Sequence, residues 1–154
     1  MTDQPSVGGD LLKKYLHTTT AALFDGADEL VSFGFPDANF PDNTIAWTDV
    51  RGEVAYATAT PQRTRDEDVE LDFIISCSQG GAAVAEITVS DRAFAYFRQI
   101  ERLVRITDPT CGGVAQWAFI TRYQSSGLDN PDAIANGRVV EINATISARV
   151  RIRN

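Results

Sequence analysis

The sequence is poor in the residues from which most enzyme sites are built. Among 154 residues there is one histidine, His17, and there are two cysteines, Cys77 and Cys111. Two cysteines make no disulfide framework, and their separation fits no zinc motif. The chain also lacks a glycine-rich phosphate loop, a serine elbow and a paired-histidine metal motif. Because no catalytic constellation is found, we expect a protein that is not an enzyme and uses no cofactor.

Long apolar runs are also absent. No stretch approaches the roughly 20 residues of a membrane-spanning helix, and the polar start of the chain lacks a signal-peptide pattern. With 44% hydrophobic and 23% charged residues, the chain is expected to form one soluble globular domain at residues 10–154. Residues 1–9 are expected to be a disordered lead-in, and no membrane partner is expected.

Positive charge is scarce, and it is unevenly distributed. The net charge is −7, with 16 acids and 5 bases in residues 1–91 but 5 acids and 9 bases in residues 92–154. An acidic protein is a poor general binder of nucleic acid. If the two halves form separate surfaces, their opposite charges suit head-to-tail self-association. If the halves interleave in space, the polarity disappears, and both alternatives stay open.

The clearest pattern that is present closes the chain, in "RVVEINATISARVRIRN" (138–154). Every even position from Val140 to Ile152 is apolar, and the odd positions from 141 onward are polar. A period of two over this length predicts a half-buried strand, much longer than the usual five or six residues. Arg149, Arg151 and Arg153 then lie in one file, roughly 6.6 Å apart.

Hydrophobic periodicity predicts two helices, each followed by two main strands. A helix from Asp10 to Phe24 has a fair N-cap and an apolar stripe. A second helix either spans 82–106 or starts at Asp91, because three β-branched residues in a row disfavour its first part. Strands are predicted at 52–60, 69–78, 114–124 and 138–154, with another through Ile45 and Trp47 and with loops at 31–44, 61–68 and 125–137. This order predicts an α+β fold, a single mixed or antiparallel sheet with two helices on one face.

Three features carry more specific expectations. The strand 114–124 has apolar residues on both faces, so a central place in the sheet is expected. Cys77 falls on the apolar face of its strand, so a buried thiol is expected. His17 lies in the first helix without an assignable partner, so we expect it to be solvent-exposed or hydrogen-bonded at a cap, and not to act as a catalytic base.

A cluster of acids could hold a hard cation through its oxygen atoms. The cluster comprises Asp66, Glu67, Asp68, Glu70 and Asp72. Glu70 and Asp72 share the polar face of a predicted strand, and the other three belong to the loop before it. Arg63 and Arg65 are near enough to neutralise them. We therefore favour a charged surface over a metal site, and titration with Mg²⁺ or Ca²⁺ distinguishes the two.

Three segments in order resemble one protein family. They are "RTRDEDVELDFIIS" (63–76), "ERLVRITDPTCGG" (101–113) and "VAQWAFITRY" (114–123), followed by the long alternating strand. Over about residues 50–154, their order and spacing resemble the tail terminator proteins of long-tailed, siphovirus-type phages, in particular those infecting actinobacteria. No single motif is specific by itself.

The resemblance implies a structural virion protein, located at the head-proximal end of the tail and assembled in the host cytoplasm. Such proteins form a hexameric ring that caps the tail tube, stops its polymerisation and joins the tail to the head. The implied partners are other copies of the chain, the tail tube protein and the head-tail connector protein, with DNA only passing through the lumen. The implied fold is a mixed sheet flanked by helices, similar in shape to the tube subunit. The alternatives are a head-completion connector protein, a tail-tube subunit or, as a different class, a small metal-dependent nuclease.

Two charged segments are the candidate subunit or partner interfaces. The loop 61–68, with Arg63, Arg65, Asp66, Glu67 and Asp68, is expected to protrude and to contact a neighbouring subunit or the tube. The alternative is a solvated hairpin tip. Arg149, Arg151 and Arg153 repel one another unless something opposes them. The opposing surface could be the acidic segment 66–72 of the same or an adjacent subunit, or DNA in the ring. We favour contact with a subunit, so that the arginines are presented to another protein chain, over a solvated face or DNA.

Overall fold

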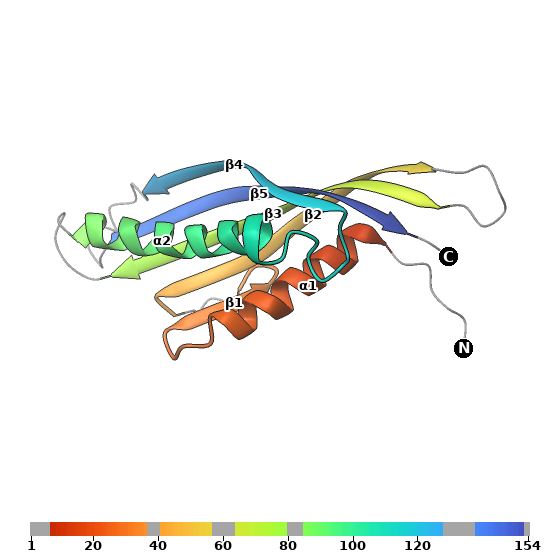
Figure 1. Cartoon of the computed structure of the whole chain (residues 1–154). Coiled ribbons are helices and arrows are strands. Elements are labelled where there is room, and N and C mark those ends of the chain that lie inside the picture. Colours follow the sequence, from red (N-terminus) through yellow and green to blue (C-terminus); the bar gives the residue numbers. More distant parts are fainter. Residues whose placement is uncertain (1–6, 37–40, 57–63, 80–84, 128–137, 153–154) are drawn as a thin grey trace.

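A computed structural model describes residues 7–36, 41–56, 64–79, 85–127 and 138–152. Its elements are α1 (Gly8–Leu23), β1 (Glu29–Phe33), β2 (Asn43–Tyr56), β3 (Arg65–Gln79), α2 (Ala85–Arg102), the π-helical turn η1 (Leu103–Thr107), β4 (Trp117–Gly127) and β5 (Arg138–Ile152). The strands form one sheet in the order β1-β2-β3-β5-β4 (Figure 1). Strand β1 runs parallel to β2, and the other neighbours are antiparallel. The expected mixed sheet is confirmed.

Both helices pack on the same face of this sheet (Figure 1). Helix α1 covers β1, β2 and β3 and buries Leu12 and Leu16, while α2 covers β3 and β5 and buries Val89 and Ile100. Apolar stripes at helical spacing meet an apolar sheet face, which is how a two-layer domain forms its core. The predicted α+β class with two helices on one face is confirmed. None of the described helices is long and apolar enough to span a membrane.

The period-two patterns of β3 and β5 supply the sheet side of the core. In β5, all the even positions from Val140 to Ile152 are buried, as the sequence predicted. In β3 the buried residues are the odd positions from Glu67 to Cys77, so the expectation of a buried Cys77 thiol is also confirmed. The ring of Trp47 packs on that of Phe73, and its indole N–H donates to a hydroxyl of α1.

Strands β1 and β2 differ from the prediction. Residues 29–33 form a strand where a loop was expected at 31–44, because β1 gains its hydrogen bonds from distant β2. The predicted strand at 45–47 and the described part of that at 52–60 form one strand, β2, and residues 57–60 lie outside the described residues. A bulge between Trp47 and Val50 interrupts the alternation, and a bulge puts two residues opposite one. The interruption makes one strand resemble two in sequence.

Helix α1 begins at Gly8, two residues before the predicted start and inside the predicted lead-in. Its N-cap residue offers no side-chain hydrogen bond, and the cap comes instead from β3, where the Glu67 carboxylate accepts the Gly8 N–H at 2.5 Å. A Cβ atom on Gly8 would lie 2.5 Å from that carboxylate and 2.9 Å from Val150. Glycine is required because the helix start touches the sheet. Residues 1–6 lie outside the described part of the chain.

Helix α2 corresponds to the longer of the two predicted alternatives, and its end is anchored to α1. The π-helical turn leads into the motif Asp108-Pro-Thr-Cys-Gly-Gly, in which Cys111 and both glycines have positive φ. The Asp108 carboxylate accepts the Tyr15 hydroxyl and the Gly112 N–H. A Cβ on Gly112 would come within 2.5 Å of the Tyr15 ring. This motif therefore has a structural role, holding the α2–β4 connection on α1.

Strand β4 is the main correction. A central position was predicted for residues 114–124, but in the described sheet β4 is an edge strand whose one neighbour is β5. A bulge between Ile120 and Arg122 breaks its alternation. Several of its apolar residues consequently stay exposed although they suggested a buried strand. The exposed fractions of Trp117, Phe119 and Tyr123 are 38%, 50% and 58%.

Candidate interaction surface

The face of the sheet opposite the helices, here called the open face, is lined with charge. Every second residue of a strand points to the same side, so β3 presents four carboxylates there. This carboxylate file is Asp66, Asp68, Glu70 and Asp72. The register places Arg151 of β5 opposite Asp66, and Arg149 opposite Asp68. The pairing of strands thus aligns a basic file with one end of an acidic file.

Both arginines form two-pronged ion pairs with the carboxylates that they face. Arg149 donates to the two oxygens of Asp68 at 2.8 and 3.1 Å. Arg151 donates to those of Asp66 at 2.7 and 2.8 Å. Such bidentate pairs are the strongest common form of side-chain ion pair. The repulsion between Arg149 and Arg151 is therefore reduced by Asp68 and Asp66 of the same chain. These aspartates belong to the acidic segment 66–72, which was one of the surfaces that the sequence suggested.

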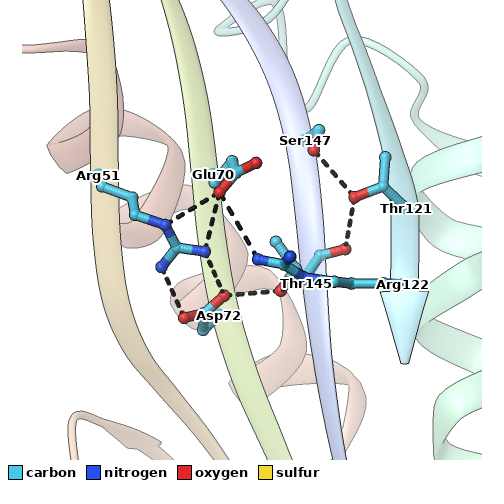
Figure 2. Close-up of polar contacts among 7 residues, drawn as sticks. All are labelled: Arg51, Glu70, Asp72, Thr121, Arg122, Thr145 and Ser147. Atoms are coloured by element: carbon cyan, nitrogen blue, oxygen red, sulfur yellow. Dashed lines mark hydrogen bonds and ion pairs between the residues drawn. The ribbon is translucent and has the colours of Figure 1, made fainter. Parts of the chain in front are cut away.

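The other end of the carboxylate file is neutralised from β2 (Figure 2). The Arg51 guanidinium contacts Glu70 at 2.9 Å and both oxygens of Asp72, at 2.7 and 3.2 Å. From the other side, Arg122 of β4 approaches Glu70 at 3.7 Å. The carboxylates are thus paired with cations from three different strands.

Hydroxyl groups extend this network to the edge strand (Figure 2). The Thr145 hydroxyl donates to Asp72 at 2.7 Å and accepts Arg122 Nε–H at 3.3 Å. The hydroxyls of Thr121 and Ser147 lie 2.9 Å apart. Thr145 is 5% exposed, and a buried hydroxyl needs such partners. The polar contacts therefore connect β2, β3, β5 and β4 across the open face.

The arginines lower the pKa values of three of these carboxylates, those of Asp66, Asp68 and Asp72. Hydrogen bonding from Arg151 lowers the pKa of Asp66, and that from Arg149 lowers the pKa of Asp68. Arg51, and secondarily Thr145, lower the pKa of Asp72, while Asp72 and Glu70 raise the pKa of Arg51. Each ionised form is favoured by an opposite charge or a hydrogen bond. These three aspartates are therefore held as anions, which does not suit them to act as general acids.

The candidate interface residues of the predicted 61–68 loop do not share one location. Arg65, Asp66, Glu67 and Asp68 belong to β3, so the prediction of a loop was wrong for them. These charged residues pair with residues of β2 on one side and of β5 on the other. A high density of charge therefore does not by itself end a strand. Glu67 points to the helix face, where it is 4% exposed and lies 3.7 Å from Arg65. Arg63 and Arg153 lie outside the described residues, and contact of any of these residues with a partner stays a prediction.

Sequence reasoning missed the residues that complete the network. Arg51, Arg122 and Thr145 come from three strands, and only the register brings them to the carboxylate file. The available signal was the alternation of β3, which predicted one acidic face. It could not say which cations would face it.

The open face carries shallow depressions and one aromatic pair. Trp117 and Phe119 stack with ring centroids 5.9 Å apart on β4. A depression of about 590 Å³ lies between Trp117 and Arg51, and another of about 430 Å³ reaches from Phe35 to Arg122. Within the described ranges, neither is lined by a histidine or a cysteine, and no group of acids, histidines and cysteines is arranged to hold a metal ion. The arrangement suits non-covalent contact with another macromolecule.

His17 does not belong to this surface. It lies on α1, half-buried, with its ring edge-to-face against Phe33 at 5.4 Å. Phe33 also accepts the Lys13 ammonium over its ring, 4.1 Å from the centroid. The histidine is therefore packed against an aromatic ring, which is neither of the two environments expected.

Comparison with known proteins gives a distant likeness only. No family model matches the sequence, and no curated protein matches it. One similar solved structure is titled "Virion of native gene transfer agent (GTA) particle". It aligns with a TM-score of 0.43 and 16% identity, over 92% of this chain and 92% of that chain. This likeness is too distant to carry a functional argument.

Proposed function

We propose that the chain is a structural protein of a phage-type virion and acts as a tail terminator. The observation that carries this proposal is the order and spacing of the three resembling segments within residues 50–154. They correspond to β3, to the turn that anchors η1 on α1, and to β4. These segments supply the carboxylate file, the anchored connection and the free edge of the sheet.

In this role the chain forms a closed ring, as a hexamer, at the head-proximal end of the tail tube. It ends tube growth and joins the tail to the head-tail connector, and DNA passes through the lumen. A ring needs two different surfaces on each subunit, because head-to-tail contacts close only through a rotation. The two edges of this sheet, β1 and β4, differ in length and surroundings, which supports a contact of this kind.

The chain is proposed to work without catalysis. Among the described residues, the open-face carboxylates are paired with arginines, and the single histidine is packed on Phe33. The two cysteines are buried, and burial raises the pKa of each thiol to about 11. These groups support cohesion of the fold and not a nucleophilic reaction.

The experiment is sedimentation velocity of the purified full-length chain over a range of concentrations, combined with electron microscopy. A terminator gives one closed ring of constant size. Growth into long tubes would instead identify a tube subunit, the second candidate, whose fold is expected to be similar. A monomer with nuclease activity that requires Mg²⁺ would overturn the structural role altogether.

A further inference from the structure

Strand β4 has the composition of a flanked strand, but none of the described strands lies on its outer side. Its sequence "WAFITRYQSSG" contains no proline or lysine and runs for 11 residues. Natural proteins protect free edges with short strands, prolines or lysines, because a long apolar edge is a template for another chain. One bulge and Arg122 are the protective features that β4 carries. The edge is therefore poorly suited to permanent exposure to water.

The surface around this edge is apolar and basic. We call it the β4 margin and define it by Phe119, Arg122 and Tyr123 of β4 with Arg98 and Arg102 of α2. Tyr123 packs on Phe94 and Phe97, which joins α2 to the strand. Arg98 and Arg102 are exposed, one turn apart, and make no ion pair with another described residue. Arginine and aromatic side chains are both enriched in protein interfaces.

The opposite side of the molecule is apolar and mainly acidic, with Lys13 as a base beside it, over the Phe33 ring. We call it the β1 margin and define it by Leu23, Asp25, Asp28 and Phe33, from the end of α1, the following turn and β1. Leu23 and Phe33 are each 48% exposed. Asp25 and Asp28 are exposed and form no ion pair with another described residue. Because β1 and β4 are the two outermost strands, this margin and the β4 margin lie on opposite sides of the sheet.

We propose that the β4 margin binds the β1 margin of a second copy of this chain. Two arguments select a second copy as the occupant. The margins are complementary in charge, with unpaired arginines on one and unpaired aspartates on the other, and each also exposes large apolar side chains. They also belong to different surfaces of one chain, so the contact is heterologous and leaves a free margin at each end of a dimer.

This inference rests on the proposed function and adds to it the surfaces that join the subunits of the ring. The carboxylates of the open-face network are not assigned to this contact, because they already form ion pairs within the subunit. Of the residues on that face, only Phe119 and Arg122, at its β4 edge, belong to a margin, so contact through the margins leaves the carboxylate file uncovered. The prediction is specific, because it assigns assembly to residues outside the charged segments that the sequence first suggested.

The test uses two variants of the full-length chain. One is Phe119→Asp with Arg98→Gln, which places an acid on the β4 margin and removes one of its cations. The other is Asp25→Arg with Asp28→Arg, which reverses the charge of the β1 margin. All four side chains are exposed, so each variant should keep the wild-type thermal unfolding. Val54→Asp, also on an exposed apolar residue but outside both margins, is the matched control.

Sedimentation velocity should find wild type and the Val54 control in closed oligomers, and each double variant as a monomer. Mixing the two double variants should give a 1:1 dimer and nothing larger, because each contributes one intact margin. If the β1-margin variant alone dimerises, β4 pairs with β4 and the inference is wrong. If both variants still form the wild-type ring, the ring uses other surfaces and only this inference fails. If wild type forms no closed oligomer at any concentration, the proposed function fails as well.

Discussion

The two adjacent strands β5 and β4 are both rich in apolar residues, but the fold uses them differently. In β5 the apolar residues alternate strictly, and the strand lies between two neighbours with one face in the core. In β4 they occur on both faces, and the strand lies at the edge. Alternation therefore predicts which face of a strand is buried. Apolar residues on both faces, in contrast, do not predict whether the strand is central or at the edge of the sheet. The excess apolar surface of β4 is what we assign to assembly.

The largest effect should come from removing one apolar side chain from each strand. Ile146 of β5 is fully buried, so Ile146→Ala should lower the free energy of unfolding by about 2–5 kcal/mol. Phe119→Ala should change it by only about 0.5 kcal/mol, because surface substitutions usually do. Urea unfolding of the dilute protein measures both. Similar losses for the two variants would mean that β4 is buried within the subunit.

The contact between α1 and β5 should give the next largest effect. Gly8→Ala places a methyl group against Glu67 and Val150, and such overpacking costs about 1–3 kcal/mol of unfolding free energy. Thr18→Ala, at an exposed position of the same helix, is the control and should be neutral or slightly stabilising. Thermal and urea unfolding provide the values. An unchanged Gly8 variant would show that the helix start does not need its close approach to β5.

The contacts of Asp72 of β3 on the open face, which include Thr145 of β5, should contribute to stability in a pH-dependent manner. The pKa of Asp72 is lowered by Arg51 and by Thr145 of β5. A lowered pKa in the folded state gives stability that is present above the unfolded pKa, about 3.9, and is lost as the pH falls through the folded value. Asp72→Asn should thus be less stable than wild type at pH 7, and the difference should shrink at lower pH. Urea unfolding between pH 7 and pH 2 tests this, and a difference independent of pH would contradict the ion pair.

The smallest effect is expected at the arginine file of β5. Arg151→Gln removes the exposed pair with Asp66, and exposed pairs add little to stability. The small loss in thermal unfolding temperature should disappear in concentrated salt, which screens such pairs. Assembly should be unchanged, because the pair lies within one subunit. A loss of assembly at low salt would restore Arg151 to the list of subunit contacts.

The sequence predicted what depends on near neighbours and missed what depends on distant ones. The period-two runs placed the buried face of β5 and the thiol of Cys77 correctly, since a strand side is set by its own pattern. The pair of Arg151 and Asp66 joins residues 85 positions apart, and only the register of β3 and β5 creates it. The early start of α1 has the same kind of cause, because its cap is Glu67. Bulges in β2 and β4 broke the alternation and misled both strand predictions.

Hydrogen–deuterium exchange on the full-length chain, dilute and concentrated, tests the central claim most directly. We predict that concentration protects the backbone amides of β4 from Trp117 to Tyr123 and those of the turn that holds Asp25 and Asp28. The amides around Arg51 on β2 should exchange at the same rate in both samples. Protection near Arg51 with no change in β4 would contradict the account, because it would assign assembly to the open face.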